Sequence, residues 1–409
     1  MGLDELRRRS RELLLAVLRS AAERRRVAAA AAAEKARMGL PLEDPYVEGE
    51  LWDIAMEEAE RSGMDPRSAG RLTWELVRDS LVVQGALRDE PMYPPSASEE
   101  DVVRLDLDVW PPLLELGGGG HAGSLEAAES ELAGALGVSS ESTVAFPSLR
   151  EAFRTALRAI AEGVGAVLYE PVHPWVAQAV WEAGGRPYRV HREVGDCWRL
   201  RLPDSVRRGW IVVVENPDYV TGVVHGAGEI DELHAFSASS GVQLVHLSAC
   251  AIPSGGMPPP PDDSVWIGGI GCALGSVDSG PAWIVARRLS GRLRRLRDSV
   301  GALPRPTDVS ATASAISSGA LARVRDRVSE RLSVVRELLP RGLVEYCEPS
   351  LGPHLFALGP RVPAWKSGVA LARGAAFGRY PDGFRINFMV DEDVLRLGLG
   401  RLVLSLLQR

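Results

Sequence analysis

The stretch LDELRRRSRELLLAVLRSAAERRRVAAAAAAEKARM, residues 3–38, contains neither glycine nor proline and is rich in leucine, alanine, arginine and glutamate. This composition favours a single helix of about 35 residues, roughly 50 Å long at 1.5 Å per residue. Leu6, Leu13 and Val17 recur near the helical period. A helix this long exceeds what one small domain can cover, so we expect it to pack against a partner chain.

Two shorter helices are predicted after the first, over residues 45–61 and 66–87, because Gly39 and Pro41 interrupt the helical pattern. Residues 89–101 are rich in proline, serine and acidic residues, a composition typical of a linker. The sequence therefore predicts a helical domain over residues 1–88 that is followed by a linker.

Polar residues of the first domain are spaced in a way that places several on common helix faces. Arg24 and Lys35 are eleven residues apart, a net rotation of about 20° on a helix, so they share a face. Arg7 lies about 25 Å from Arg24 along the helix and reaches such a site only in a second, antiparallel subunit. The spacing alone is also compatible with a solvent-exposed charged helix face that binds no ligand. Two further polar pairs have i,i+4 spacing, Asp44 with Glu48 and Ser80 with Gln84.

These positions resemble the pattern of the all-helical (AroQ-type) chorismate mutase domain. That pattern runs from L-x-x-L-R through A-E-R-R, a lysine and D-x-x-x-E to D-S-x-x-x-Q. The spacing fits without a gap across residues 3–88. One position departs, Val47, where the family usually has an arginine, and this implies weaker substrate affinity. The chain reads Leu3–Arg7, Ala22–Arg25, Lys35, Asp44 with Glu48, and Asp79–Ser80 with Gln84.

The resemblance implies conversion of chorismate to prephenate, a rearrangement within one molecule that requires no nucleophile and no cofactor. Catalysis then rests on holding the substrate and stabilising charge on the ether oxygen. Arg24 of one subunit and Arg7 of its partner would bind the two carboxylates bidentately, which implies a homodimer with shared active sites. The implied catalytic set is Arg7, Arg24, Lys35, Asp44, Glu48, Ser80 and Gln84.

The remaining members of the set have implied roles at the other end of the substrate. Lys35 and Gln84 would donate hydrogen bonds to the ether oxygen, and Ser80 would assist the arginines. Asp44 and Glu48 would orient the ring hydroxyl and hold Lys35.

From residue 102 the pattern changes to short β-rich runs separated by helical stretches, which indicates a mostly parallel sheet covered by helices. From about Val309 a smaller α+β domain is predicted, with one long helix to Leu339, strands near 343–346, 355–358 and 384–389, and a closing helix to 408. The predicted domains are 102–308 and 309–409. The strands of the larger one are predicted at 142–146, 166–170, 187–190, 210–215, 242–247, 265–268 and 282–286, with helices at 150–161, 175–182 and 229–239.

This part of the chain resembles a fold-type-I PLP-dependent enzyme of the aminotransferase or glycine decarboxylase kind. The segment Asn216–Gly222, NPDYVTG, resembles the aminotransferase N-P-x-N-P-T-G. The segment Phe384–Asn387 resembles the strand whose arginine binds a substrate carboxylate. Arg385 is thus either a structural strand residue or a carboxylate anchor. The fold class expected for the whole chain is multidomain, an all-α unit followed by a PLP-transferase-like α/β unit and its small domain.

Three positions of the resemblance depart from the family's chemistry. The strand-end aspartate aligns with His246, the asparagine that contacts the cofactor's hydroxyl aligns with Tyr219, and the lysine that binds PLP aligns with Cys272. Lys366, the only lysine besides Lys35, comes about 95 residues too late. We therefore expect PLP to be unlikely as a cofactor.

The leading hypothesis is a chorismate mutase, an isomerase of aromatic amino acid biosynthesis, fused to an aminotransferase-like domain without its catalytic lysine. The alternative is a bifunctional chorismate mutase and aromatic (prephenate) aminotransferase. A second alternative is a regulatory binding protein in which neither domain is catalytic, and Val47 is the only residue that favours it.

Composition narrows the partners and the compartment. The net charge of -7 argues against nucleic acid, and no apolar run reaches the roughly 20 residues of a membrane span. The chain is charged from Asp4 onward, which does not resemble a secretory signal. The cysteines are far apart and lack metal-ligand spacing, so we expect reduced thiols, no metal and a cytoplasmic protein. They are Cys197, Cys250, Cys272 and Cys347.

Overall fold

The computed structural model describes residues 2–38, 45–84, 102–116, 123–160, 165–204, 206–250, 264–360 and 367–408. Within the first two ranges, the side chains of residues 35, 36, 38, 45–49, 67, 78, 81, 82 and 84 are not described. The chain divides into two compact units, Met1–Pro91 and Met92–Arg409, which we call the first and the second unit. The predicted linker, residues 89–101, lies outside the described residues.

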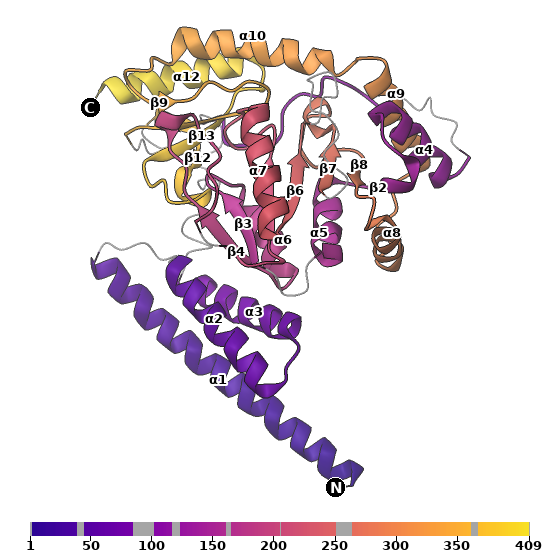
Figure 1. The fold of residues 1–409 in the computed structure, drawn as a ribbon. Coiled ribbons are helices and arrows are strands. Elements are labelled where there is room, and N and C mark those ends of the chain that lie inside the picture. Colours follow the sequence, from indigo (N-terminus) through magenta and orange to yellow (C-terminus); the bar gives the residue numbers. More distant parts are fainter. Residues whose placement is uncertain are drawn as a thin grey trace. The chain divides into compact units, whose positions relative to one another are not determined.

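The first unit consists of three helices where the sequence predicted them, α1 (Leu3–Met38), α2 (Pro45–Ser62) and α3 (Pro66–Gln84) (Figure 1). Helix α3 packs against both α1 and α2. Val77 of α3 is buried beside Leu51 and Trp74. The first half of α1 is exposed on all sides, its apolar side chains included.

The second unit is built around a seven-stranded sheet in the order β2-β8-β7-β6-β5-β3-β4 (Figure 1). Adjacent strands run parallel to one another from β7 through β6, β5 and β3 to β4. Strand β8 runs antiparallel to both of its neighbours, β2 and β7. The mostly parallel sheet agrees with the sequence prediction. The strands are β2 (Thr143–Phe146), β3 (Gly165–Tyr169), β4 (Arg186–Val190), β5 (Ile211–Glu215), β6 (Gln243–Ser248), β7 (Val265–Gly269) and β8 (Ala282–Val285).

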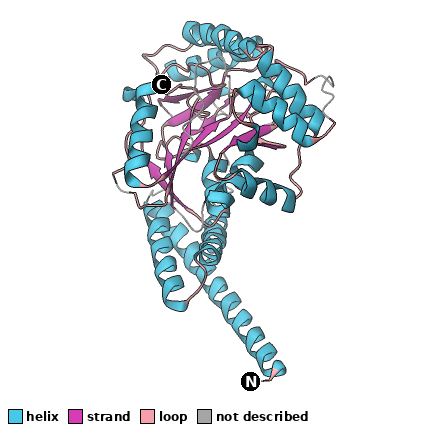
Figure 2. Cartoon of the chain, turned by 45° about the vertical axis from the view of Figure 1, so that its right-hand side comes forward, coloured by secondary structure: helices cyan, strands magenta, loops and turns pink. Residues whose placement is uncertain are grey.

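Alternating residues of these strands face opposite sides of the sheet, as the period of a strand requires. Val167, Val212 and Leu244 pack with Leu233 of α7 (Ala227–Ser240) on one face. Their neighbours in sequence belong to the larger core on the other face. Figure 2 shows the strands side by side among the helices that cover them. The helices contributing to the larger core include α4 (Leu125–Leu136), α5 (Leu149–Ile160), α6 (Pro174–Glu182) and α8 (Ser290–Ser299).

A second, smaller sheet has the order β12-β13-β10-β9, and the strand β1 near the start of the unit pairs with β11 near its end. The C-terminal helix α12 packs against α10. The bounds are β1 (Val103–Arg104), β9 (Glu345–Tyr346), β10 (His354–Leu358), β11 (Val369–Ala370), β12 (Ala372–Arg373), β13 (Gly383–Asn387) and α12 (Glu392–Leu407).

The long helix predicted from Val309 to Leu339 is wrong, because two helices occupy this stretch. They are α9 (Pro306–Ser317) and α10 (Ala322–Leu338). Gly319, which lies between them, has φ +70°, a left-handed conformation that ends a helix and that glycine adopts without a steric penalty.

The expectation of reduced cysteines is also wrong for this structure. Cys197 is disulfide-bonded to Cys347, and Cys250 to Cys272. The residues of each pair are 150 and 22 positions apart, so only the fold brings them together. Separately, none of the helices in the described ranges is long and apolar enough to cross a membrane.

Candidate functional site

Polar side chains converge on Asp108 at the carboxyl edge of the large sheet, the edge at which open α/β sheets bind their ligands. His173 follows β3, and Tyr219 follows β5. His354 and Arg385 come from β10 and β13 of the small sheet. We call these five residues the Asp108 cluster. Sequence analysis singled out only Tyr219 and Arg385 among them.

Asp108 receives hydrogen bonds from three sides. Its Oδ1 lies 2.7 Å from an Arg385 nitrogen, Nη2, and accepts from the Tyr219 hydroxyl at 3.1 Å. Its Oδ2 lies 3.2 Å from Nε2 of His173. Since a carboxylate only accepts, His173 must carry its proton on Nε2, and its Nδ1 is then free to accept from the Trp175 amide at 3.4 Å.

His354 is oriented by a hydrogen bond to the backbone. Its Nδ1 lies 3.0 Å from the Tyr219 carbonyl oxygen, so Nδ1 is the donor. The other nitrogen, Nε2, faces Asp108 Oδ1 at 3.7 Å, beyond hydrogen-bonding distance. A neutral His354 thus turns a lone pair toward the cluster.

Arg385 is fully buried between aromatic rings. Its guanidinium carbon lies 4.9 Å from the centre of the Phe377 ring and 5.9 Å from that of Tyr219. Nη2 also donates to the Asp106 carbonyl at 3.3 Å. Two other donors, Nε and Nη1, have no hydrogen-bond partner among the described residues. A buried guanidinium with unused donors retains capacity for an acceptor.

The protonation states follow from burial and charge. Burial would raise the pKa of the Asp108 carboxyl, but the hydrogen bond from His173 and the charge of Arg385 outweigh it and hold the pKa far below its usual value. Burial lowers the pKa of both His173 and His354. At neutral pH the cluster therefore contains one carboxylate, one guanidinium and two neutral imidazoles.

The segment that carries Asp108 is fixed on both sides. On one side, the Asn387 side-chain amide donates to the carbonyls of Leu107 at 2.9 Å and Val109 at 3.0 Å. On the other, the Trp110 amide donates to the Gly275 carbonyl at 2.9 Å. Gly275 has φ +87°, and a Cβ there would lie 2.5 Å from the Trp110 carbonyl oxygen, so this close approach requires glycine.

The turn that carries Tyr219 is shaped by Asp218, whose Oδ1 accepts from the amides of Val220 and Thr221, both at 2.9 Å. The turn ends at Gly222, with φ +72°. A Cβ at Gly222 would lie 2.4 Å from the His354 carbonyl oxygen. Glycine at this position thus allows the turn to pack against β10.

Cys272 lies beside the Asp108 cluster. Its carbonyl accepts from the Trp110 indole Nε1 at 3.1 Å, and the Trp110 ring contacts the His354 ring edge-on with centroids 5.9 Å apart. The Cys272 sulfur is bonded to Cys250, and both residues are buried. Lys366 lies outside the described residues.

His246 does not reach the cluster, contrary to its alignment with the strand-end aspartate. It lies two residues before the end of β6. Its ring packs near the ring of His234 on α7, with centroids 5.0 Å apart. Burial lowers the pKa of His246 to about 3, so the ring is neutral. The strand alternation places the side chain on the α7 face of the sheet, the face that Leu244 also shares.

In the first unit, two residues of the predicted catalytic set meet at one carbonyl. Arg24 Nε donates to the Leu76 carbonyl at 3.4 Å, and the Ser80 hydroxyl donates to the same oxygen at 2.9 Å. Arg7 lies at the other end of α1, where its side chain is exposed and pairs with Asp4 at 3.5 Å. The structure brings Arg24 and Ser80 together and leaves Arg7 apart from them.

The other members of the set cannot be placed at side-chain level. Lys35, Glu48 and Gln84 lie on α1, α2 and α3, and their side chains are outside the described part, as is that of Val47. Asp44 lies outside the described residues altogether.

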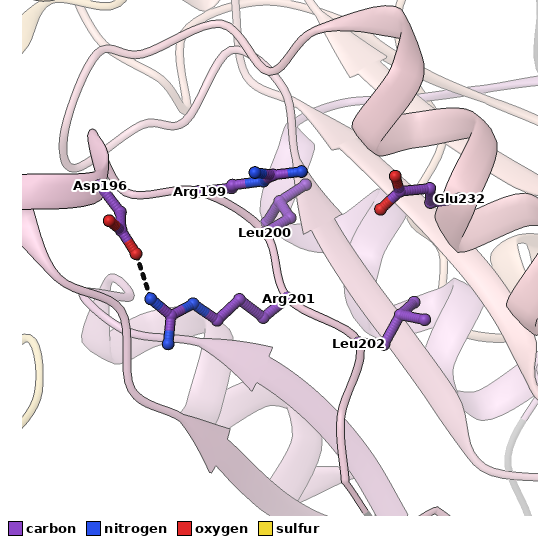
Figure 3. Close-up of a pocket in the computed structure, with 6 residues that line it drawn as sticks. All are labelled: Asp196, Arg199, Leu200, Arg201, Leu202 and Glu232. Atoms are coloured by element: carbon purple, nitrogen blue, oxygen red, sulfur yellow. Dashed lines mark hydrogen bonds and ion pairs between the residues drawn. The ribbon is translucent and has the colours of Figure 1, made fainter.

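A surface pocket of about 430 Å³ occurs in the second unit. Figure 3 shows that it is lined by charged side chains, with Arg201 paired to Asp196. It is broadly open, and none of its lining residues belongs to the Asp108 cluster. The lining residues are Asp196, Arg199, Leu200, Arg201, Leu202 and Glu232.

No family model matches the sequence, and no curated protein resembles it closely enough to count as a relative. Solved structures do match. An aspartate aminotransferase from Thermotoga maritima is 16% identical, with a TM-score of 0.61 over 81% of this chain and 96% of that one. The aspartate aminotransferase from Thermus thermophilus, solved with maleate, is 17% identical, with a TM-score of 0.61 over 75% and 92%.

An aromatic aminotransferase from Pyrococcus horikoshii is 18% identical, with a TM-score of 0.61 over 76% of this chain and 97% of that one. At these identities the likeness defines the fold. The α/β architecture with its mostly parallel sheet is that of an aminotransferase, accompanied by a helical N-terminal region.

The expectation that PLP is unlikely is wrong, because the matched structures are PLP-dependent aminotransferases. The residues of this chain limit how the cofactor fits. Cys272 has no amine, and its sulfur is bonded to Cys250, so this position cannot hold PLP through a nitrogen.

Proposed function

We propose that the first unit is a chorismate mutase, which converts chorismate to prephenate. The observation that carries the proposal is the meeting of Arg24 and Ser80 at the Leu76 carbonyl, which joins α1 to α3 through two of the residues that the family pattern requires. The Arg24 guanidinium is half-buried, and only Nε is used in this contact. Its two terminal amino groups are the fork that a carboxylate binds.

The proposal requires a second copy of the chain, since Arg7 is about 25 Å from Arg24 along the helix. The exposed apolar side chains of α1 support such a pairing. Leu13, Leu14 and Val17 are 53%, 60% and 51% exposed. Apolar side chains gathered on one helix favour burial against a partner. An antiparallel partner would cover them and bring its own Arg7 to Arg24.

The experiment is a chorismate assay with the purified full chain and no added cofactor. Prephenate should form, followed as loss of the chorismate absorbance and as phenylpyruvate after acid treatment. The matched control is the Arg24→Ala chain, which keeps the helices and removes the guanidinium. An absence of turnover by the natural chain at millimolar chorismate would reject the proposal.

A second candidate function concerns the second unit. The comparisons support its aminotransferase half more directly than the mutase proposal, since one matched structure is an aromatic aminotransferase. On this alternative the chain is bifunctional, and the second unit transfers an amino group to prephenate or another aromatic keto acid with PLP. PLP would supply the amino-group chemistry, and this chain would contribute the buried edge around Arg385.

PLP titration tests this alternative in two stages. Saturable binding of PLP, seen by absorbance and by quenching of tryptophan fluorescence, would support the fold-based assignment. Reduction with borohydride should then leave no PLP attached to Cys272. Amino transfer from glutamate or aspartate to prephenate would establish the activity, and its absence with bound PLP would leave the unit as a binding domain.

A further inference from the structure

The Asp108 cluster has the composition of an anion site that already contains an anion. Arg385 is fully buried, and a buried guanidinium requires a counter-charge. Asp108 supplies that charge at 2.7 Å. The carboxylate is also held by the Tyr219 hydroxyl and by His173, so these two groups and Arg385 donate to it as they would to a bound ligand.

The carboxylate is positioned before any ligand arrives. Asn387, two residues after Arg385 on β13, donates hydrogen bonds to the backbone carbonyls on both sides of Asp108. The Trp110 contacts with Gly275 and Cys272 fix the far end of the segment. Asp108 is therefore a fixed part of the site, unlike a side chain on a hinged loop.

We propose that Asp108 is a built-in occupant of a carboxylate site at Arg385, so that the second unit in this state takes no free carboxylate there. Two features mark the site as built for an acceptor. Nε and Nη1 of Arg385 have no hydrogen-bond partner within the described part of the chain, and the Asp108 side chain is partly open, with 16% of it exposed. The consequence is a site that is neutral overall. The proposal is independent of the mutase activity of the first unit.

Chemical rescue tests the proposal. Asp108→Ala removes the carboxylate and leaves room for a small anion beside Arg385. The unfolding temperature of the full chain should fall by several degrees. Sodium formate should then restore about half of the loss, because an anion that binds only the folded state stabilises it. Sodium pivalate at the same concentration, too bulky for the space, should restore little.

Two variants control the assignment. Asp108→Ala combined with Arg385→Gln should lose the response to formate, since no charge remains to bind it. Asp106→Ala removes another buried carboxylate of the same segment, one paired with Arg104 at 2.7 Å, whose side chain is 34% exposed. Formate should not stabilise that variant more than pivalate does.

The outcomes separate cleanly. Formate rescue that depends on Arg385 supports the proposal, and equal responses to formate and pivalate overturn it. The unfolding temperature of the natural chain provides a second test, which does not depend on whether an Asp108 variant folds. If formate raises its unfolding temperature and Arg385→Gln abolishes that rise, the site is open to free carboxylates and the proposal is wrong.

Discussion

The arginines of the two units differ in their burial and in the groups that they contact. Arg7 and Arg24 of the first unit contact a surface aspartate and a backbone carbonyl, and Arg7 remains 64% exposed at its side chain. Arg385 of the second unit is fully buried and paired with Asp108. Both units resemble families that bind carboxylates with arginine. The comparison teaches that the surroundings of an arginine matter as much as its place in a family pattern: the Asp4 carboxylate beside Arg7 is exposed and easily displaced, whereas the Asp108 carboxylate beside Arg385 is held in place.

The largest expected effect concerns the donor that we propose for the ether oxygen of chorismate in the first unit. Lys35→Ala should lower kcat/KM for chorismate at least about 100-fold, because a donor to developing negative charge is lost. The matched control is Arg37→Ala on the same helix, an exposed residue that bonds Glu34 at 2.6 Å. Circular dichroism should show both variants equally helical. A near-normal rate for Lys35→Ala would show that the site is misplaced.

Mixing two inactive variants tests whether the first unit shares its arginines between subunits. Arg7→Ala and Arg24→Ala should each be inactive. In a mixed dimer, one site combines the intact Arg24 of one subunit with the intact Arg7 of the other. Random mixing after unfolding and refolding should therefore recover about a quarter of natural turnover. No recovery, with dimers formed, would place both arginines in sites within one subunit.

The third expected effect is a loss of stability in the second unit alone, because all four cysteines lie in that unit. The Cys197–Cys347 bond closes a loop of 150 residues, which in the chain-entropy model stabilises by about 5 kcal/mol. The double variant Cys197→Ser and Cys347→Ser should lower the urea midpoint of the second unit while mutase turnover survives. Thiol titration of the denatured, unreduced chain should find no free thiol, and four thiols would contradict the pairing.

The smallest effect is a pH dependence, again confined to the second unit, since the first histidine of the chain is His121. Burial lowers the pKa of His246 to about 3 from 6.5, so the folded state stays neutral where the unfolded state takes a proton. Stability is complete above pH 6.5 and is lost as the pH falls toward 3. Between pH 6.5 and 5 the loss is about 2 kcal/mol.

His246→Leu should flatten this dependence in urea denaturation followed from pH 7 to 5. His173 and His354, whose pKa values burial also lowers, contribute losses of the same sign and should remain in the variant. An unchanged slope would show that His246 is not a buried neutral group.

Local patterns predicted most elements of the fold, since β-rich runs and their helices are properties of short segments. The break at Gly319 was missed because a single glycine within a helical pattern is usually tolerated. The antiparallel direction of β8 depends on pairings across the sheet and has no local signal.

The Asp108 cluster could not be predicted for the same reason. Asp108 lies 65 residues from His173 and 111 from Tyr219. Nothing in the sequence around Asp108 distinguishes it from its neighbour Asp106. In the first unit, by contrast, Arg24 and Ser80 each followed from helical spacing, and only their meeting at Leu76 required the structure.

The pairing of β1 with β11 has a consequence for synthesis on the ribosome. Val103 lies beside Val369, and the Leu105 carbonyl accepts from the Asn387 amide at 2.7 Å. The start of the second unit can therefore be fixed only after residues more than 260 positions later in the sequence have been synthesised. Contacts so distant in sequence form late and slowly. We expect the nascent helices to fold first, while the segment that carries Asp108 settles only after residues 369–387 have been synthesised.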